Sequence, residues 1–253
     1  MKNNVNTSHA IQPMPLPIAL LFFGIPMLLF VFVQRVVAPY LDSLGVPPLA
    51  NFFVLMSPHI LFFFGALIAY RMEGNPFTRE AFSQRFRLNP IRGKTWGWVA
   101  LAVIGEIALY LLVYVAGKPI LKIIYDAVPD PEILNRVLGD STTFVGYPLS
   151  GNFWLLGIYL TYYFFNILGE EFWWRGYIFP RQELVHGSRT WLVHGVLWAG
   201  FHLFSPYNAL MVLPGALLVS WIAQKQQNNW IFLIAHAAIN ALAMLRIISG
   251  ILS

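Results

Sequence analysis

The sequence predicts an all-α polytopic membrane protein in which about seven transmembrane helices, with a range of six to eight, form one helical bundle. Hydrophobic residues occupy 58% of its 253 positions and charged residues only 11%, whereas soluble domains carry roughly 25% charge. The mean hydropathy of +0.62 excludes disordered and nucleic-acid-binding classes, because both require polar surface. The apolar excess must therefore face lipid, which makes the lipid bilayer the first expected partner. The chain contains no cysteine, which excludes disulfides and thiolate chemistry.

Seven apolar segments are candidates for spans, since a bilayer core of about 30 Å requires roughly 20 helical residues. The last three segments are short and closely spaced. Ser205 and Pro206 separate the fifth from the sixth. If Pro206 only kinks one longer helix, the number of spans falls to six. The first segment is longer than the apolar core of a signal peptide and is interpreted as a retained span. The predicted spans cover residues 15–37, 50–70, 95–116, 152–179, 191–204, 207–223 and 230–251.

The basic residues are unevenly distributed between the two predicted sides of the membrane. Six of them lie between Arg71 and Lys94 and are interpreted as an orientation and head-group feature. With seven spans, the positive-inside rule places the N-terminus in the cytoplasm and the C-terminus outside. Of the 16 basic residues, 11 then lie on the inner side, including Lys2, and five lie on the outer side. The outer five are Arg35, Lys118, Lys122, Arg136 and Arg246.

The outer loop, residues 118–150, contains a further predicted element. Pro129-Asp130-Pro131 is followed by Glu132 and by apolar residues at 133, 134, 137 and 138. This pattern predicts a short capped amphipathic helix that lies at the membrane interface.

Two carboxylates and a guanidinium interrupt the fourth apolar segment. Ionisable groups inside a span cost several kcal/mol each and usually face a partner or a wet cavity, so they mark a functional site by default. Glu171 and Arg175 are four residues apart and lie on one helix face, where they can pair. Glu170 is rotated by about 100° from Glu171 and points elsewhere. An interfacial anchor would explain Arg175 but not two adjacent carboxylates.

Two more pairs of residues with i, i+4 spacing lie in the short spans: Trp198 with His202, and His236 with Asn240. Alone, His202 would more often be a packing histidine, and His236 with Asn240 an interhelical contact worth about 1 kcal/mol. However, Glu170, His202, His236 and Asn240 all lie roughly 9 to 17 Å from the cytoplasmic ends of their spans. Three helices are therefore expected to bring a carboxylate, two imidazoles and an amide to one layer of the membrane.

These four side chains have the chemistry needed to hydrolyse an amide with an activated water. A buried carboxylate such as Glu170 can exchange protons near neutrality, and His202 can share in activating the water. His236 and Asn240 are donors suited to a developing oxyanion. No metal or other cofactor is expected. Zinc held by Glu170, His202 and His236 is the alternative, because this ligand set leaves an open position for water.

Two other polar residues within spans are open to simpler interpretations. Glu106 lies in the middle of the third segment among apolar neighbours. It is either a proton carrier or ion partner of Arg175, or a protonated acid that is hydrogen-bonded between helices. His59 follows Pro58 in the second segment and is expected to bond the carbonyl groups that the proline leaves free.

Three motifs, in this order on three spans, resemble those of the CPBP family, the CAAX-protease and bacteriocin-processing (ABI) membrane proteins. They are Glu170-Glu171-x-x-x-Arg175, Trp198-x-x-x-His202 and His236-x-x-x-Asn240. The family's second motif usually begins with Phe, which Trp198 replaces with another aromatic group. The resemblance divides one integrated membrane domain into a three-span region with its outer loop, residues 1–150, and a catalytic core, residues 151–253.

The resemblance implies an intramembrane endopeptidase of the glutamic type in a prokaryotic inner membrane. Its substrate would be a peptide or a membrane-anchored protein, cleaved near the cytoplasmic face. The position of Glu170 would act with that of His202 to activate water. The implied catalytic residues are Glu170, His202, His236 and Asn240, and the implied supporting residues are Glu171, Arg175 and Trp198.

Two other functions are compatible with the same polar residues. A non-proteolytic membrane scaffold or bacteriocin-immunity-type protein of this family would use them to bind a partner helix. A proton-coupled transporter would be built around Glu170, Glu171 and Glu106, but the lack of internal sequence repeats counts against it.

Overall fold

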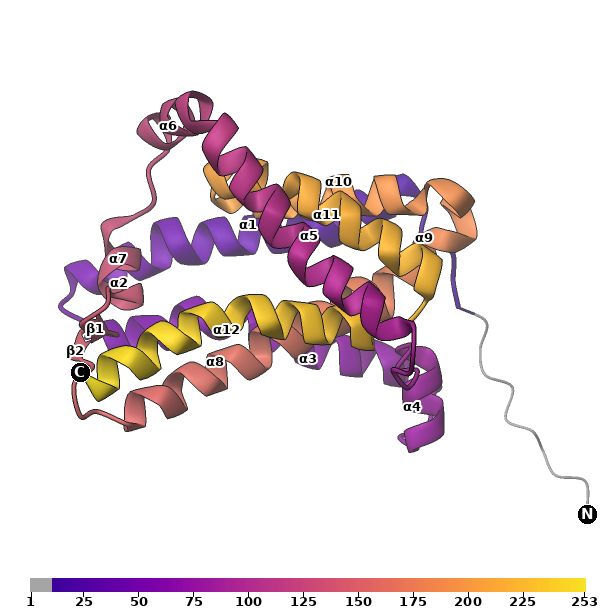
Figure 1. The fold of residues 1–253 in the computed structure, drawn as a ribbon, viewed down its shortest axis with the longest axis horizontal. Coiled ribbons are helices and arrows are strands. Elements are labelled where there is room, and N and C mark those ends of the chain that lie inside the picture. Colours follow the sequence, from indigo (N-terminus) through magenta and orange to yellow (C-terminus); the bar gives the residue numbers. More distant parts are fainter. Residues whose placement is uncertain (1–10) are drawn as a thin grey trace, which may run out of the picture.

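A computed structural model describes residues 11–253 as a helical bundle with a short β-hairpin (Figure 1). The predicted all-α polytopic fold is confirmed. The α-helices are α1 (Leu16–Phe32), α2 (Ala38–Ser43), α3 (Pro48–Met72), α4 (Arg79–Arg85), α5 (Thr95–Ala116), α6 (Lys118–Ala127), α7 (Glu132–Leu138), α8 (Trp154–Glu170), α9 (Phe179–His186), α10 (Thr190–Phe201), α11 (Pro206–Gln226) and α12 (Trp230–Leu252). The π-helices are η1 (Val33–Val37) and η2 (Glu171–Ile178), the 3-10 helices are η3 (Gly187–Arg189) and η4 (His202–Phe204), and the strands are β1 (Thr143–Phe144) and β2 (Tyr147–Pro148).

Five helices of the described part are long and apolar enough to cross a bilayer. Four are single helices and one is the continuous run of α1, η1 and α2. Only 11% of the most apolar stretch of α5 is buried within the bundle, so the rest of that stretch is available to lipid. The five are Leu16–Ser43, Pro48–Met72, Thr95–Ala116, Pro206–Gln226 and Trp230–Leu252.

The other two predicted spans are helical but unusual. α8 has 17 residues and continues without a break through η2 and α9. α10 has only 12 residues before it tightens into η4, which is shorter than the roughly 20 residues of a full crossing. Seven complete crossings therefore stay a prediction.

The chain reverses direction at Ser205 and Pro206. Ser205 is extended, with φ −129° and ψ 92°, and Pro206 starts α11, a position that proline favours because no N–H bond is needed there. α10 and α11 pack side by side (Figure 1), and a Cβ on Gly195 would lie only 3.0 Å from Cα of Leu217. The predicted break is confirmed, and the alternative of one kinked helix is wrong.

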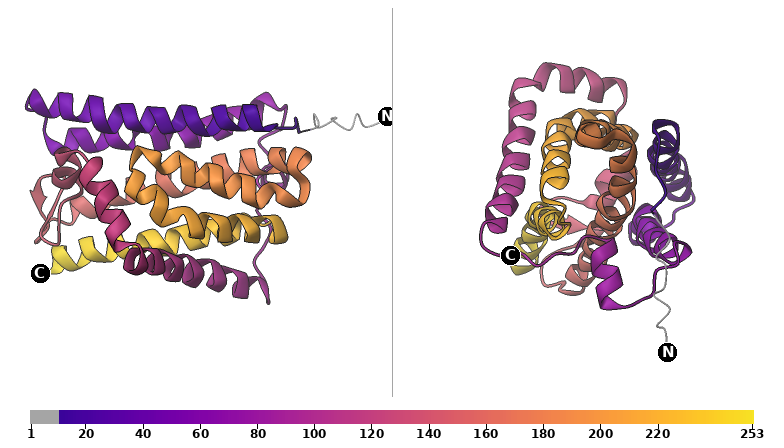
Figure 2. Two further views of the ribbon diagram at one scale, coloured as in Figure 1. Left: turned by 90° about the horizontal axis from the view of Figure 1, so that it is seen from above. Right: turned by 90° about the vertical axis from the view of Figure 1, so that its right-hand side faces the viewer.

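The two ends of the bundle differ. α4 and α9 lie at one end, which we call the cationic end, and α2, α7 and the β-hairpin lie at the other, the loop end (Figures 1 and 2). The α10–α11 hairpin stops short of the loop end in Figure 1 and in the left view of Figure 2. The segments that carry the predicted inner basic residues lead to the cationic end. The segments that carry the five predicted outer basic residues lead to the loop end. Lys2 lies outside the described residues.

Glu73 joins three segments at the cationic end. Arg85 Nε donates to Glu73 Oε2 over 2.6 Å, and Arg181 Nη2 donates to Oε1 over 2.5 Å. Arg85 also donates to the carbonyl of Gly176 over 2.6 Å. Burial would raise the pKa of Glu73, but the two guanidinium groups hold it below its usual value. Arg85 is buried, so its interpretation as a head-group feature is wrong.

The amphipathic helix predicted in the outer loop is present as α7. Ile133 and Val137 are buried, and α7 packs against α3. No side chain caps its first turn, which begins after Pro131, so the predicted cap is wrong. The following turn is organised by Asp140, because hydrogen bonds from the backbone and side chain of Thr142 and from Thr143 hold its pKa at about 2.

Candidate active site

The polar residues of the predicted site line one cavity inside the bundle. Its volume is about 560 Å³, and its walls include Glu170, His202, His236 and Asn240. The structure thus brings together the four residues that the sequence assigned to one layer. They come from α8, η4 and α12, which is the arrangement expected from the three motifs.

Glu171 forms the buried centre of a network that supports the cavity wall. Its Oε1 accepts a hydrogen bond from Arg175 Nη1 over 3.2 Å and lies 3.0 Å from His236 Nδ1. Its carbonyl accepts from Asn229 Nδ2 over 3.0 Å. The predicted pairing of Glu171 with Arg175 is confirmed. The guanidinium of Arg175 also lies over the ring of Trp198, 4.1 Å from its centre, which is cation–π geometry.

Glu170 points away from Glu171, as predicted, and belongs to a separate chain of hydrogen bonds. Asn166 Nδ2 donates to Glu170 Oε1 over 3.1 Å, and Asn240 Nδ2 donates to Asn166 Oδ1 over 2.9 Å. Glu170 is 5% exposed, so these bonds act in a site that is largely closed to solvent. The bond from Asn166 is made to Oε1, so Oε2 is the oxygen to which a water molecule would bind.

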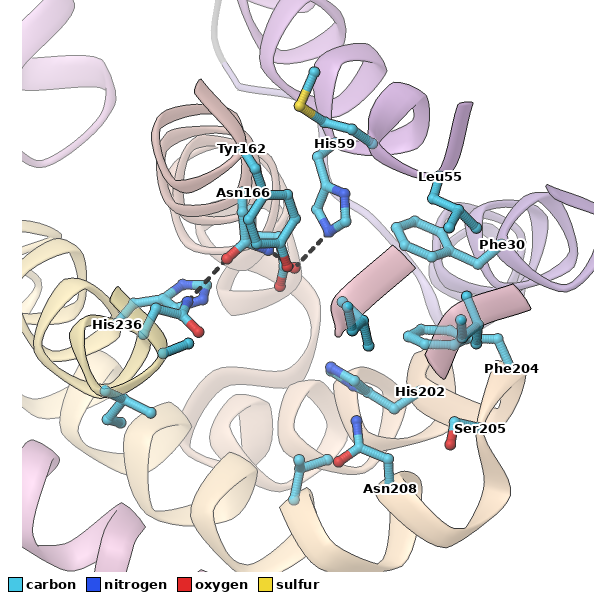
Figure 3. A pocket seen from close by; sticks show the side chains of 18 of the residues that line it. Phe30, Leu55, His59, Tyr162, Asn166, His202, Phe204, Ser205, Asn208 and His236 are labelled. Atoms are coloured by element: carbon cyan, nitrogen blue, oxygen red, sulfur yellow. Dashed lines mark hydrogen bonds and ion pairs between the residues drawn. The ribbon is translucent and has the colours of Figure 1, made fainter. Parts of the chain in front are cut away.

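His202 lies at the end of α10, on the opposite side of the cavity from Asn166 (Figure 3). Its Nδ1 is 2.8 Å from the carbonyl oxygen of Trp198. A carbonyl only accepts, so Nδ1 must carry the hydrogen of the neutral imidazole. Nε2 then holds a lone pair that can accept a hydrogen bond from water.

The structure corrects the role expected for His59. Ser57 Oγ, not His59, bonds the carbonyl of Val54 over 2.7 Å, and this is the carbonyl four residues before Pro58. His59 instead points from α3 into the cavity (Figure 3), where its Nε2 lies 3.6 Å from Glu170 Oε1.

Glu106 lines the cavity from α5. Its side chain packs against Gly215 of α11, where an added Cβ would be 3.4 Å from Glu106 Cγ. Among the described residues Glu106 has neither an interhelical hydrogen bond nor an ion pair with Arg175, which pairs with Glu171 instead, so its role as a proton carrier or as a protonated structural acid stays a prediction.

The alternative zinc set is not assembled in this conformation. Within residues 11–253, no three His, Asp or Glu side chains are grouped closely enough to hold a metal ion. His236 Nδ1 is directed at Glu171, and His202 Nδ1 at a backbone carbonyl. No chemical step is therefore assigned to a metal.

The cavity does not extend toward the cationic end, where the sequence placed the cytoplasmic face. Its lining extends to the loop end and includes Gln34, Asp130, Leu138 and Arg246. No lining residue comes from the described segments of the cationic end between 71 and 94 or between 180 and 190. Cleavage near the cytoplasmic face, inferred from depth along the helices, is not supported by the direction of this cavity.

Asn166 was missed in the sequence although its spacing could have revealed it. It lies four residues before Glu170, on the same helix face. Tyr159 and Tyr163 were also missed; their hydroxyls donate to the carbonyls of Asn240 and Ala237 over 2.8 and 2.7 Å. These bonds join α8 to α12 beside the site, and no local pattern indicates them.

The fold and the cavity define a class: a polytopic helical membrane protein with a polar, ionisable site inside the bundle. Residues 152–242 match the model of a family described as type II CAAX prenyl endopeptidase Rce1-like. The matched segment contains all three motifs, which confirms the resemblance to the CAAX-protease family. It supports an intramembrane endopeptidase in general terms. The comparisons with curated proteins and with solved structures gave no match.

Proposed function

We propose that this protein is an intramembrane endopeptidase of the glutamic type that hydrolyses a peptide bond with an activated water. The observation that carries the proposal is that two acceptor groups line one cavity: the carboxylate of Glu170, whose Oε1 accepts from Asn166, and the imidazole of His202, whose Nδ1 donates to Trp198. A water between these two acceptors donates a hydrogen to each, which directs its own lone pair toward a substrate carbonyl.

The proton transfers balance within this set. Glu170 accepts a proton as the water oxygen attacks the carbonyl carbon, and a tetrahedral oxyanion forms. When this intermediate collapses, the C–N bond breaks and Glu170 returns the proton to the leaving amine. The first products are a new carboxylic acid and a new amine, which become a carboxylate and an ammonium group when the proton of the acid passes to the amine, and the carboxylate of Glu170 is restored without a covalent intermediate.

In this proposal His236 and Asn240 support the oxyanion. The Asn240 amide has two N–H groups, of which one is directed to Asn166 Oδ1 and the other is available to substrate. His236 donates Nδ1–H to the Glu171 carboxylate, which orients the ring and stabilises its charged form, in which Nε2 also donates. Removing one such donor typically slows catalysis about 10²- to 10³-fold.

The substrate proposed is a peptide or a membrane-anchored protein segment. A cavity of about 560 Å³ holds a few residues of extended chain and not a folded domain. The matched family is named for CAAX prenyl endopeptidases, but prenylation of the substrate is not part of this proposal, since no feature of the described cavity identifies a prenyl group.

The test is co-expression of the wild type and of variants with a library of membrane-anchored peptides, with new termini identified by mass spectrometry. Glu170→Gln keeps the shape of the side chain and removes the base, so cleavage should fall by at least about 10³-fold. His202→Ala should also abolish detectable cleavage. Glu80→Gln, an exposed carboxylate of α4, is the matched control and should cleave as the wild type does.

A chelator added to the purified protein tests metal dependence. Activity that survives chelation supports the glutamic mechanism, whereas a loss restored by zinc would overturn it.

The scaffold or immunity alternative has a different signature. If Glu170→Gln retains the cellular phenotype that deletion removes, and neither protein generates new termini, the endopeptidase proposal is wrong.

A further inference from the structure

One imidazole from the N-terminal spans reaches the candidate base. His59 Nε2 lies 3.6 Å from Glu170 Oε1, the same oxygen that accepts from Asn166. His59 is 8% exposed and lies outside the residues matched by the family model, 152–242. It therefore adds to the site a group that the three motifs do not contain.

The contact between His59 and Glu170 follows from the packing of α3 on α8. A Cβ on Gly169 would lie 2.6 Å from the carbonyl oxygen of His59 and 3.3 Å from the nitrogen of Phe63, so glycine is required where the two backbones meet. The imidazole itself is held edge-on by Phe30 and Tyr162, at centroid distances of 5.0 and 5.5 Å. Both the backbone and the ring of His59 are thus held beside Glu170.

We propose that His59 is a positioning residue for Glu170, an inference that rests on the proposed hydrolytic function. With Asn166, it directs an N–H toward Oε1, which favours the ionised carboxylate in a buried site and leaves Oε2 free for water. Nε2 is the ring nitrogen of His59 that faces Glu170, and the proposal requires this nitrogen to carry the hydrogen of the neutral imidazole. A separation of 3.6 Å exceeds a direct hydrogen bond, and the attraction acts through the N–H dipole or a bridging water.

Other groups around Glu170 also affect its ionisation. Arg175 and a charged His236 favour the carboxylate, and the charge of Glu171 opposes it. A change at His59 must therefore be compared with variants in which these groups are unaltered. The titratable and charged groups that face Glu170 are His59 of α3, Tyr162 of α8, Glu171 and Arg175 of η2, His202 of η4 and His236 of α12.

Three variants separate positioning from packing. His59→Phe keeps an aromatic ring but removes the N–H, and His59→Gln restores a donor. His194→Gln is the control: this buried histidine packs edge-on against Phe23 and Phe179 but lies outside the cavity lining. Each variant is purified, and only those with the thermal stability and elution profile of the wild type are compared.

We expect His59→Phe to lower kcat about tenfold at neutral pH while KM changes less than about twofold. The acidic limb of its pH–rate profile should move to higher pH, because the neutral acid is favoured once the donor is lost. His59→Gln should recover most of kcat, and His194→Gln should show the wild-type profile. Unchanged kcat and pH profile in a folded His59→Phe would overturn the inference, as would an equal effect of His194→Gln.

A second measurement does not need activity. Infrared spectra at neutral pH should show the carbonyl stretch of a protonated carboxylic acid in His59→Phe, and this band should be absent in the double variant with Glu170→Gln. If the wild type cleaves no peptide, the proposed function fails, while this band still tests whether His59 controls Glu170. Identical spectra for wild type and His59→Phe would show that it does not.

Discussion

Glu171 illustrates, at the scale of one residue, how a buried charge is retained inside a membrane. It is 2% exposed, and one carboxylate oxygen faces both Arg175 and His236 while the other has no partner among the described residues. A buried ion pair of this kind contributes little net stability, but removing one partner leaves an uncompensated charge. The pair contacts His236 through Glu171 and the ring of Trp198 through Arg175, and we expect it to orient both.

Arg175→Met should destabilise the protein by about 3–5 kcal/mol, because it leaves the buried Glu171 charge without its guanidinium partner. The double variant with Glu171→Gln removes both charges and should recover most of this loss. The measurement is unfolding in mixed detergent, followed for the two single variants and the double. Additive losses would mean that Glu171 and Arg175 are not coupled.

At the scale of elements, the π-helix η2 is the local feature that shapes the site. Short π-helical turns occur often at functional sites, since they widen the helix and redirect side chains. Here η2 begins at Glu171, directly after Glu170 ends α8. Gly176 within η2 admits the ring of Phe86, which an added Cβ would approach to 2.3 Å, so η2 is held from the cationic end.

The ion pairs of Glu73 with Arg85 and Arg181 make the stability of the cationic end dependent on pH. The pKa of Glu73 is lowered in the folded protein, so its contribution to stability is present above the usual carboxyl value and is lost as the pH falls through the lowered pKa. The melting temperature of the wild type should therefore decrease on acidification below about pH 4.5.

Glu73→Gln should melt at a lower temperature than the wild type at neutral pH. The difference between the two proteins should shrink as the pH falls, because protonation removes the same charge from the wild type. Thermal unfolding in detergent across this pH range measures the difference. A constant difference would show that the ion pairs with Arg85 and Arg181 do not set the pH dependence.

At the scale of the whole molecule, the alternating helices bring most of the basic residues toward the cationic end, whereas the cavity extends to the loop end. The positive-inside rule assigns the cationic end to the cytoplasm, and the cavity lining extends to the loop end. Under that orientation, we expect a substrate to reach the site from the outer half of the membrane.

The chain contains no cysteine, so single cysteines can report the orientation directly. Glu80→Cys in α4 and Ser150→Cys before α8 are both exposed and lie at opposite ends. In intact cells, a membrane-impermeant maleimide should label Ser150→Cys, and should label Glu80→Cys only after permeabilisation. The reverse pattern would invert the orientation and would place the cavity entrance in the cytoplasm.

The sequence by itself determined the class of fold, five of the spans and the residues of the three motifs. Hydropathy and helical spacing are local properties, and a rise of about 1.5 Å per residue converts position in a span into depth. For this reason Glu170, His202, His236 and Asn240 could be assigned to one layer before their contacts were known, and the pair of Glu171 with Arg175 could be expected.

Only the tertiary structure decided what surrounds these residues. The contact of His59 with Glu170 joins two helices through the missing side chain of Gly169, and nothing in the spacing along either helix indicates it. The direction of the cavity likewise depends on where the α10–α11 hairpin stops relative to its neighbours. Helical periodicity specifies the face on which a side chain lies, but which helix meets that face depends on how the spans pack together.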